Sequence, residues 1–134
     1  MSSPEKFDLS STFVHLGLGS SARPLSDFAW TQEYLEGYER ATASDGAEGR
    51  LVVMSPQAAT WTSWERHPAG DELVVQLDGR STLIQELDSG EHRLELGPGE
   101  AVINPKAVWH TVDVLEPGHA LFVTPGVGTE HRPR

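Results

Sequence analysis

The chain has 134 residues, with 20 acidic side chains against 10 basic ones and a formal net charge of −10 at pH 7. A field of this sign repels polyphosphate and anionic lipid, so we expect no binding to nucleic acid or to membranes. The sequence contains no cysteine, which excludes disulfides and thiolate chemistry and leaves histidine, carboxylate or water as metal ligands. No apolar run approaches the roughly 18 residues of a membrane span, and the start MSSPEKFDLS lacks a leader pattern, so a cytoplasmic protein is expected.

Residues 1–49 are expected to form an N-terminal extension with one short helix. Residues 12–18 (TFVHLGL) are compatible with a short strand. In residues 31–43 (TQEYLEGYERATA), Tyr34, Leu35 and Tyr38 share one helical face, which predicts a helix capped by Asp27 or Thr31. Residues 44–49 (SDGAEG) are predicted to form a loop.

From residue 50 onward the sequence changes to short β-type runs separated by glycine, proline and aspartate. The runs are RLVVMS, ATWTSWERH, DELVVQL, STLIQEL, EHRLELG, EAVIN, AVWHTVDVL and HALFVTP. Eight short runs at nearly regular spacing predict an all-β sandwich or barrel over residues 50–134. The last residues (GVGTEHRPR) are expected to be an extended tail, and the whole chain one compact domain.

Aromatic and charged residues alternate along the second run. Because successive side chains of a strand point to opposite faces, Trp61, Glu65 and His67 share one face. Trp64 and, further on, Trp109 are expected on the opposite side, packed against a second sheet, the N-terminal segment or a partner subunit.

Two later runs carry polar residues on what are predicted to be interior faces. In the third run, Glu72 shares a face with Gln76, and it joins Glu65 and His67 if the hairpin turns both faces inward. His110 shares a face with Val112, and an imidazole among valines must be hydrogen-bonded or coordinated to a metal.

These stretches resemble the two sequence motifs of the cupins, G-x5-H-x-H-x(3,4)-E-x6-G and G-x5-P-x-G-x2-H-x3-N. The matching positions are His67, Glu72, Gly79, Gly99, Pro105 and His110. The departures are Glu65 for the first histidine, Ala59 and Ala107 for glycines, and Val114 for asparagine. The alanines fall at turns, where alanine is tolerable if φ stays negative. The resemblance covers roughly residues 51–125.

The resemblance implies a small double-stranded β-helix, or jelly-roll, barrel that usually forms a homodimer. Carried over, it makes His67, Glu72 and His110 metal ligands. Glu65 is either a further ligand or a group that accepts a hydrogen bond from a ligand histidine. Two histidines with one or two carboxylates suit a divalent ion such as Fe, Mn, Ni or Zn.

Two functions remain open. The first is a metal-dependent oxygenase, isomerase or lyase acting on a small organic molecule, in which Glu65 or Glu72 moves a proton as a catalytic residue. The second is a non-catalytic barrel that binds or senses a small molecule, with a structural metal or none. Trp61, Gln76 and Val112 are expected to line the substrate pocket. The other histidines are expected at the surface or in the tail, namely His15, His92, His119 and His131.

Overall fold

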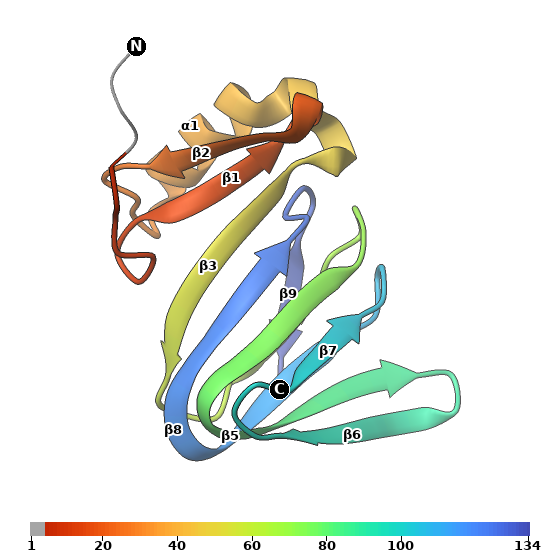
Figure 1. Cartoon of the computed structure of the whole chain (residues 1–134). Helices are drawn as coiled ribbons and strands as arrows, with labels where there is room; N and C mark the ends of the chain where they lie inside the picture. The colour runs from red at the N-terminus through yellow and green to blue at the C-terminus, as the bar shows by residue number, and fades with distance from the viewer. Residues whose placement is uncertain (1–4) are drawn as a thin grey trace.

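The computed structural model describes residues 5–134, so residues 1–4 of the expected N-terminal extension lie outside the described residues. Within them, the strands form one nine-stranded sheet with neighbours in the order β2-β1-β3-β8-β4-β9, and β5 pairs with β6, β7 and β8 (Figure 1). The elements are β1 Phe13–Gly17, η1 Leu18–Ser20, β2 Ser21–Leu25, α1 Gln32–Thr42, η2 Ala43–Glu48, β3 Arg50–Gln57, β4 Ser63–Arg66, β5 Glu72–Leu87, β6 Gly90–Leu96, β7 Ala101–Asn104, β8 His110–Thr124 and β9 Glu130–Pro133, where η marks a short 3-10 helix. The loop predicted over residues 44–49 is thus largely the 3-10 helix η2. All the strand pairs are antiparallel.

The N-terminal part is a hairpin of β1 and β2 with α1 lying beside it at one end of the sheet (Figure 1). The helix predicted over residues 31–43 is α1, and Thr31 is its cap, since the hydroxyl of Thr31 accepts from the backbone N–H of Tyr34 at 3.1 Å. Strand β2 was not predicted. Its side chains are exposed apart from Leu25, so no alternation marks it, and its pairing with β1 defines it.

His15 is buried on β1, so its expected surface position is wrong. Its Nε2 donates to Asp45 Oδ2 at 2.7 Å, since a carboxylate only accepts, and its Nδ1 lies 2.6 Å from the Tyr38 hydroxyl. The alternation of β1, in which Phe13 and His15 share the buried face, is the sequence signal that identifies this position.

Strands β5 and β8 are 16 and 15 residues long, and each joins two of the predicted runs. The gaps between these runs, at Asp78-Gly79 and at Glu116-Pro117-Gly118, were expected to be turns, but they are bends inside the strands, near the shifts in register between β5 and β8. Gly79 has a φ of +71°, and a Cβ there would lie 2.6 Å from the carbonyl oxygens of Glu116 and Pro117. The glycines therefore mark the place where the backbones of β5 and β8 come into contact. They do not mark the end of a strand.

The sheet stays open, because β2 and β9 lie at opposite ends of the strand order and do not pair. The jelly-roll expectation is confirmed, but as an open sheet and not as a closed barrel. The C-terminal tail is also more ordered than expected, since β9 pairs with β4 over residues 63–66. It has almost no apolar side chains, so its backbone hydrogen bonds and the Arg66–Glu130 ion pair define it.

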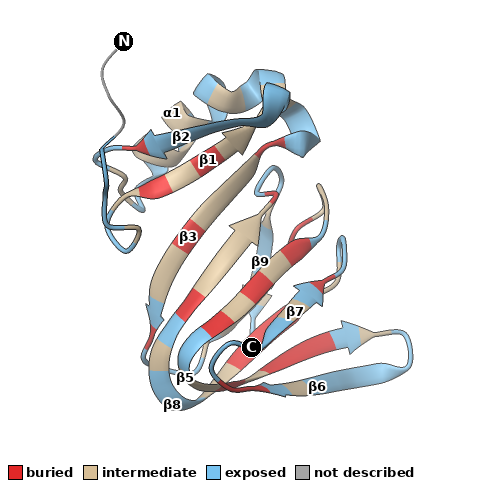
Figure 2. Cartoon of the chain, in the orientation of Figure 1, coloured by how far each residue is buried: buried red, intermediate tan, exposed pale blue. Residues whose placement is uncertain are grey.

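The core is formed by side chains of the long strands, since buried positions recur along β5 and β8 (Figure 2). Its centre is a cluster of Val74, Leu83, Leu96 and Val112. No helix in residues 5–134 combines the length and the apolar character that crossing a bilayer demands.

Candidate metal centre

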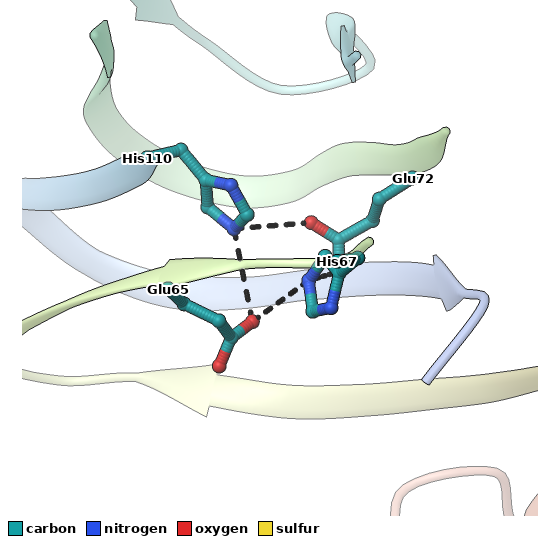
Figure 3. A group of neighbouring side chains, drawn as sticks. All are labelled: Glu65, His67, Glu72 and His110. Atoms are coloured by element: carbon teal, nitrogen blue, oxygen red, sulfur yellow. Dashed lines mark ion pairs between the residues drawn. The ribbon is translucent and has the colours of Figure 1, made fainter. Parts of the chain in front are cut away.

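Four side chains from three strands and one turn converge beside the core (Figure 3). Glu65 lies near the end of β4, His67 follows that strand, Glu72 begins β5 and His110 begins β8. Glu65 and His110 are direct partners across β4 and β8. One ligand atom from each of the four residues lies within 4.8 Å of all the others, so the group could hold a metal ion.

The two histidines approach both carboxylates through the same ring atom. His67 Nε2 lies 3.0 Å from Glu65 Oε1 and 3.1 Å from Glu72 Oε2. His110 Nε2 lies 3.4 Å from Glu72 Oε1 and 3.7 Å from Glu65 Oε1. The side chains of His67, Glu72 and His110 are at most 4% exposed, whereas Glu65 is 23% exposed. The site therefore faces solvent on the side of Glu65.

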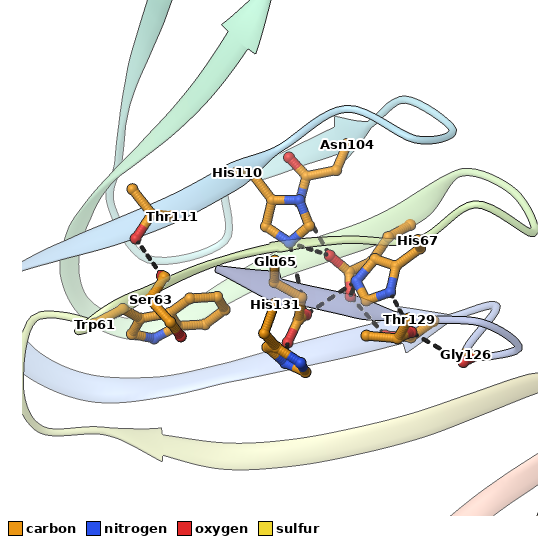
Figure 4. Close-up of polar contacts among 12 residues, drawn as sticks. Trp61, Ser63, Glu65, His67, Asn104, His110, Thr111, Gly126, Thr129 and His131 are labelled. Atoms are coloured by element: carbon orange, nitrogen blue, oxygen red, sulfur yellow. Dashed lines mark hydrogen bonds and ion pairs between the residues drawn. The ribbon is translucent and has the colours of Figure 1, made fainter. Parts of the chain in front are cut away.

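Hydrogen bonds on the far side of each ring fix the imidazole tautomers. The Thr129 hydroxyl donates to Gly126 O at 2.9 Å, which leaves its oxygen to accept from His67 Nδ1 at 2.8 Å (Figure 4). His110 Nδ1 lies 3.3 Å from Val108 O, which can only accept. In the neutral form, both rings thus carry their hydrogen on Nδ1 and a lone pair on Nε2.

These two Nε2 atoms are buried and have no hydrogen-bond partner among the described residues. Buried polar atoms are almost always paired, so two Nε2 atoms aimed at two carboxylates need either protons or a cation between them. A divalent cation satisfies all four at once. Imidazole nitrogen and carboxylate oxygen are ligands that suit Fe, Mn, Ni and Zn.

Glu72 is held more firmly than Glu65. The amide of Asn104 donates to Glu72 Oε1 at 3.0 Å, and the hydroxyl of Thr124 donates to Glu72 Oε2 at 2.6 Å. Asn104 is oriented in turn by Gln85, whose Nε2 donates to Asn104 Oδ1 at 2.9 Å. Such outer contacts orient a ligand before a metal arrives.

In the absence of a metal, the pKa values of His67, Glu65 and Glu72 are displaced from their ordinary values by burial and by their neighbours. Burial by itself lowers the pKa of His67, but hydrogen bonds and charge from Glu65 and Glu72 outweigh it and raise the pKa to about 9. Burial raises the pKa of Glu65, yet His110 and His67 hold it well below its usual range, and the pKa of Glu72 is lowered in the same way.

His131 is a fifth member that the sequence analysis missed. It stands opposite Glu65 in the pairing of β4 with β9, and its Nε2 lies 2.9 Å from Glu65 Oε2 (Figure 4). Glu65 is therefore flanked by His110 on one side and His131 on the other. His131 is exposed, as expected, but it is not isolated. The only signal for His131 in the sequence is its position in the alternation of side chains along the C-terminal run.

The three expected pocket residues lie around the interior beside the site. Trp61 has its ring centroid 6.3 Å from that of His110, and its Nε1 donates to Gln57 Oε1 at 2.9 Å. Gln76 and Val112 line a small interior hollow together with Gln57. The amide of Gln76 donates to the carbonyl of Asp78 at 2.7 Å.

Trp64 and Trp109 lie on the outer side of β4 and β8, where they stack with arginines. Arg66 lies 4.5 Å from the Trp109 ring centroid, and Arg132 lies 4.5 Å from Trp109 and 5.2 Å from Trp64. Arginines of β4 and β9 thus make cation–π contacts with both rings.

No family model and no curated protein matches the chain, whereas solved structures do. Bacillus subtilis oxalate decarboxylase, described for its Mn(II) centres, matches with a TM-score of 0.51 and 16% identity over 63% of this chain and 23% of that chain. A cupin-2 domain containing protein from Shewanella frigidimarina matches with a TM-score of 0.47 and 19% identity, covering 63% of this chain and 71% of that one. The chain has the cupin fold.

A hydroquinone 1,2-dioxygenase from Sphingomonas sp. TTNP3, with 4-hydroxybenzoate bound, matches with a TM-score of 0.49 and 17% identity over 56% of this chain. The matched part spans 58% of the dioxygenase chain and 23% of the decarboxylase chain. At 16% identity the likeness to the decarboxylase establishes the fold and no activity. The cupin resemblance drawn from the two motifs is confirmed at this level.

One departure from the cupin motif behaves differently from the expectation. Ala107 stands where the motif has glycine and has a φ of +62°, so the condition of a negative φ is not met there. The backbone N–H of Ala107 donates to the carbonyl of His67 at 3.0 Å, which ties this turn to the metal centre and holds it in the left-handed region.

Proposed function

We propose that the chain is a metal-dependent enzyme acting on a small organic molecule, with a divalent ion held by His67, His110, Glu72 and Glu65. The observation that carries this proposal is the pair of buried, unpaired Nε2 atoms aimed at two carboxylates. A bound ion would supply Lewis acidity, or redox chemistry if it is Fe or Mn. A cupin-fold neighbour with Mn(II) centres supports the proposal.

The surroundings of the carboxylates assign them different roles. Glu72 accepts hydrogen bonds on both oxygens, so it is a fixed ligand. Glu65 is the more exposed, and His131 contacts only its Oε2. We assign to Glu65 the movement of a proton to or from the substrate.

Substrate is proposed to reach the ion from the solvent-facing side of Glu65 and to lie against Trp61, with Gln76 and Val112 deeper in the interior. Trp61 offers an aromatic wall next to His110, and Gln76 offers a polar contact among apolar neighbours. Such a combination suits a compact molecule with an oxygen group that binds near the ion.

The alternative is a binding or sensing protein in which the metal is structural. One observation favours it: the protein itself offers four ligands within 4.8 Å, enough to fill a tetrahedral zinc site. An enzyme needs an open coordination position, whereas a closed structural site does not.

The two functions differ in whether water exchanges on the metal. The metal-free protein should be loaded with one equivalent of Mn(II), and the relaxation rate of bulk water protons measured before and after loading. An enzyme site predicts enhanced relaxation above that of free Mn(II), which His110→Ala abolishes. Bound Mn(II) without any enhancement would contradict the proposed enzyme and favour a closed site.

A further inference from the structure

A second hollow, of about 630 Å³, lies between β2 and α1. Its size falls within the range of roughly 300–1,000 Å³ typical of small-molecule sites. Arg23 and Leu25 of β2 line one side, and Tyr34, Tyr38 and Arg40 of α1 line the other. None of its lining residues belongs to the metal centre.

Arg23 and Arg40 are unusual among the arginines of the chain. Neither makes a side-chain hydrogen bond or an ion pair within residues 5–134. Every other arginine makes at least one, namely Arg50, Arg66, Arg80, Arg93, Arg132 and Arg134. In a chain with twice as many acidic as basic residues, two unpaired guanidiniums on one hollow stand out. One carboxylate, Glu33, also lines it, so the cations outnumber the anions.

The aromatic wall of the hollow is held in place from behind. The Tyr38 hydroxyl bonds to buried His15, which Asp45 holds in turn. Burial raises the pKa of Tyr38 to about 12 against the opposing charge of Arg23, which lines the same hollow. Tyr34 packs on Phe28 with 4.7 Å between ring centroids.

We propose that this hollow binds a small organic anion, a carboxylate on an aromatic or apolar body. Arg23 and Arg40 bind the carboxylate, because guanidinium is the side chain whose planar donors match it. Tyr34, Tyr38 and Leu25 contact the body. The site is independent of the proposed enzyme function, since it uses neither the metal nor its ligands.

The test is an NMR titration of ¹⁵N-labelled, metal-free protein with benzoate as the probe. Saturable shifts are expected for amides of residues 23–25 and 31–41, with a Kd below about 5 mM. Arg23→Gln and Arg40→Gln should each weaken binding by about tenfold. Arg93→Gln, which removes the same charge from an exposed arginine on β6, should leave the Kd unchanged.

Two further controls distinguish binding in this hollow from binding at the metal centre and from binding without the carboxylate charge. His110→Ala should bind benzoate with the wild-type Kd, and benzamide, the neutral analogue, should bind at least tenfold more weakly. The proposal is overturned if no saturable shift occurs, if Arg93→Gln weakens binding as much as Arg23→Gln does, or if His110→Ala loses binding. Shifts of the same amides on concentrating the protein without benzoate would show that a second copy fills the hollow, and would also overturn it.

Discussion

Glu65 differs from the other three residues of the centre because its side chain contacts His131 on β9, an exposed strand. His131 contacts the oxygen of Glu65 that does not face His67 and His110. Removing a group that orients a metal ligand typically costs about 10–100-fold in affinity. We therefore predict that His131→Gln weakens Zn(II) binding by at least about tenfold, measured by competition with a chelator.

His119 provides the matched control for this prediction. It is also an exposed histidine beside a carboxylate, 3.0 Å from Asp78, but it lies at the bend of β8 away from the centre. His119→Gln should leave Zn(II) affinity unchanged. Equal Zn(II) affinities for His131→Gln, His119→Gln and the wild type would show that His131 does not contribute to metal binding.

The raised pKa of His67 predicts how metal binding depends on pH. Its folded value of about 9 lies above the unfolded value near 6.5, so the protonated ring stabilises the metal-free protein. That contribution is complete below about pH 6.5 and is lost as pH rises through about 9. Since a metal needs the deprotonated ring, Zn(II) affinity should rise by about tenfold per pH unit between pH 7 and 9. A flat profile in chelator competition would contradict this.

Ala107 offers a test of backbone strain beside the centre. An L-residue in the left-handed region destabilises the folded protein by roughly 1–2 kcal/mol. Replacing it with glycine removes this strain, but glycine also gives the unfolded chain more conformational freedom, which offsets part of the gain. Ala107→Gly should therefore raise the free energy of unfolding by about 0.5–1 kcal/mol in urea. Ala101→Gly, in strand β7, should lower it by a similar amount. A lower free energy of unfolding for Ala107→Gly than for the wild type would show that the positive φ of Ala107 is not strained.

At the level of elements, the bends of β5 and β8 depend on glycines where the backbones meet. A Cβ at Gly118 would lie 2.1 Å from the carbonyl oxygen of Asp78, an atom that cannot move without shifting the strand. Gly118→Ala should destabilise the protein by at least about 2 kcal/mol, measured by thermal or urea unfolding. Gly126→Ala, where no atom lies within 4 Å of the added carbon, is the control and should have little effect.

The sequence predicts some elements better than others for physical reasons. The runs of β5 and β8 are rich in valine and leucine, so their strand character could be predicted, but the bends could not. Glycine, proline and aspartate mark a turn and a bulge alike. Strands β2 and β9 lie at the ends of the sheet and bury little, so no alternation identifies them. They form because a backbone partner is present, which is the preceding strand β1 for β2 and the distant strand β4 for β9.

At the level of the whole molecule, the candidate centre joins residues 45 positions apart, from Glu65 to His110. Motif spacing was enough to predict that Glu65, His67, Glu72 and His110 meet. The contacts that orient them could not be predicted, because Thr129 and His131 come from a C-terminal segment with no burial pattern. The hollow between β2 and α1 also depends on a strand that the sequence does not reveal.

The expected homodimer stays a prediction. Several large apolar side chains are exposed on the single chain, among them Ile103 at 51% and Leu115 at 52%. Burying them in a symmetric interface would be favourable. Sedimentation velocity should give a species of about twice 14.6 kDa, and a monomer at high micromolar concentration would contradict the dimer.

The central claim is that the four convergent side chains hold a metal ion. The most direct measurement is the metal content, by plasma mass spectrometry, of wild-type and His110→Ala protein purified without an affinity tag or chelator. We predict about one equivalent of Fe, Mn, Ni or Zn in the wild type and its loss in a variant that remains folded. Less than about a tenth of an equivalent in the wild type, not restored by added metal, would contradict the metal centre, as would full metal content in His110→Ala.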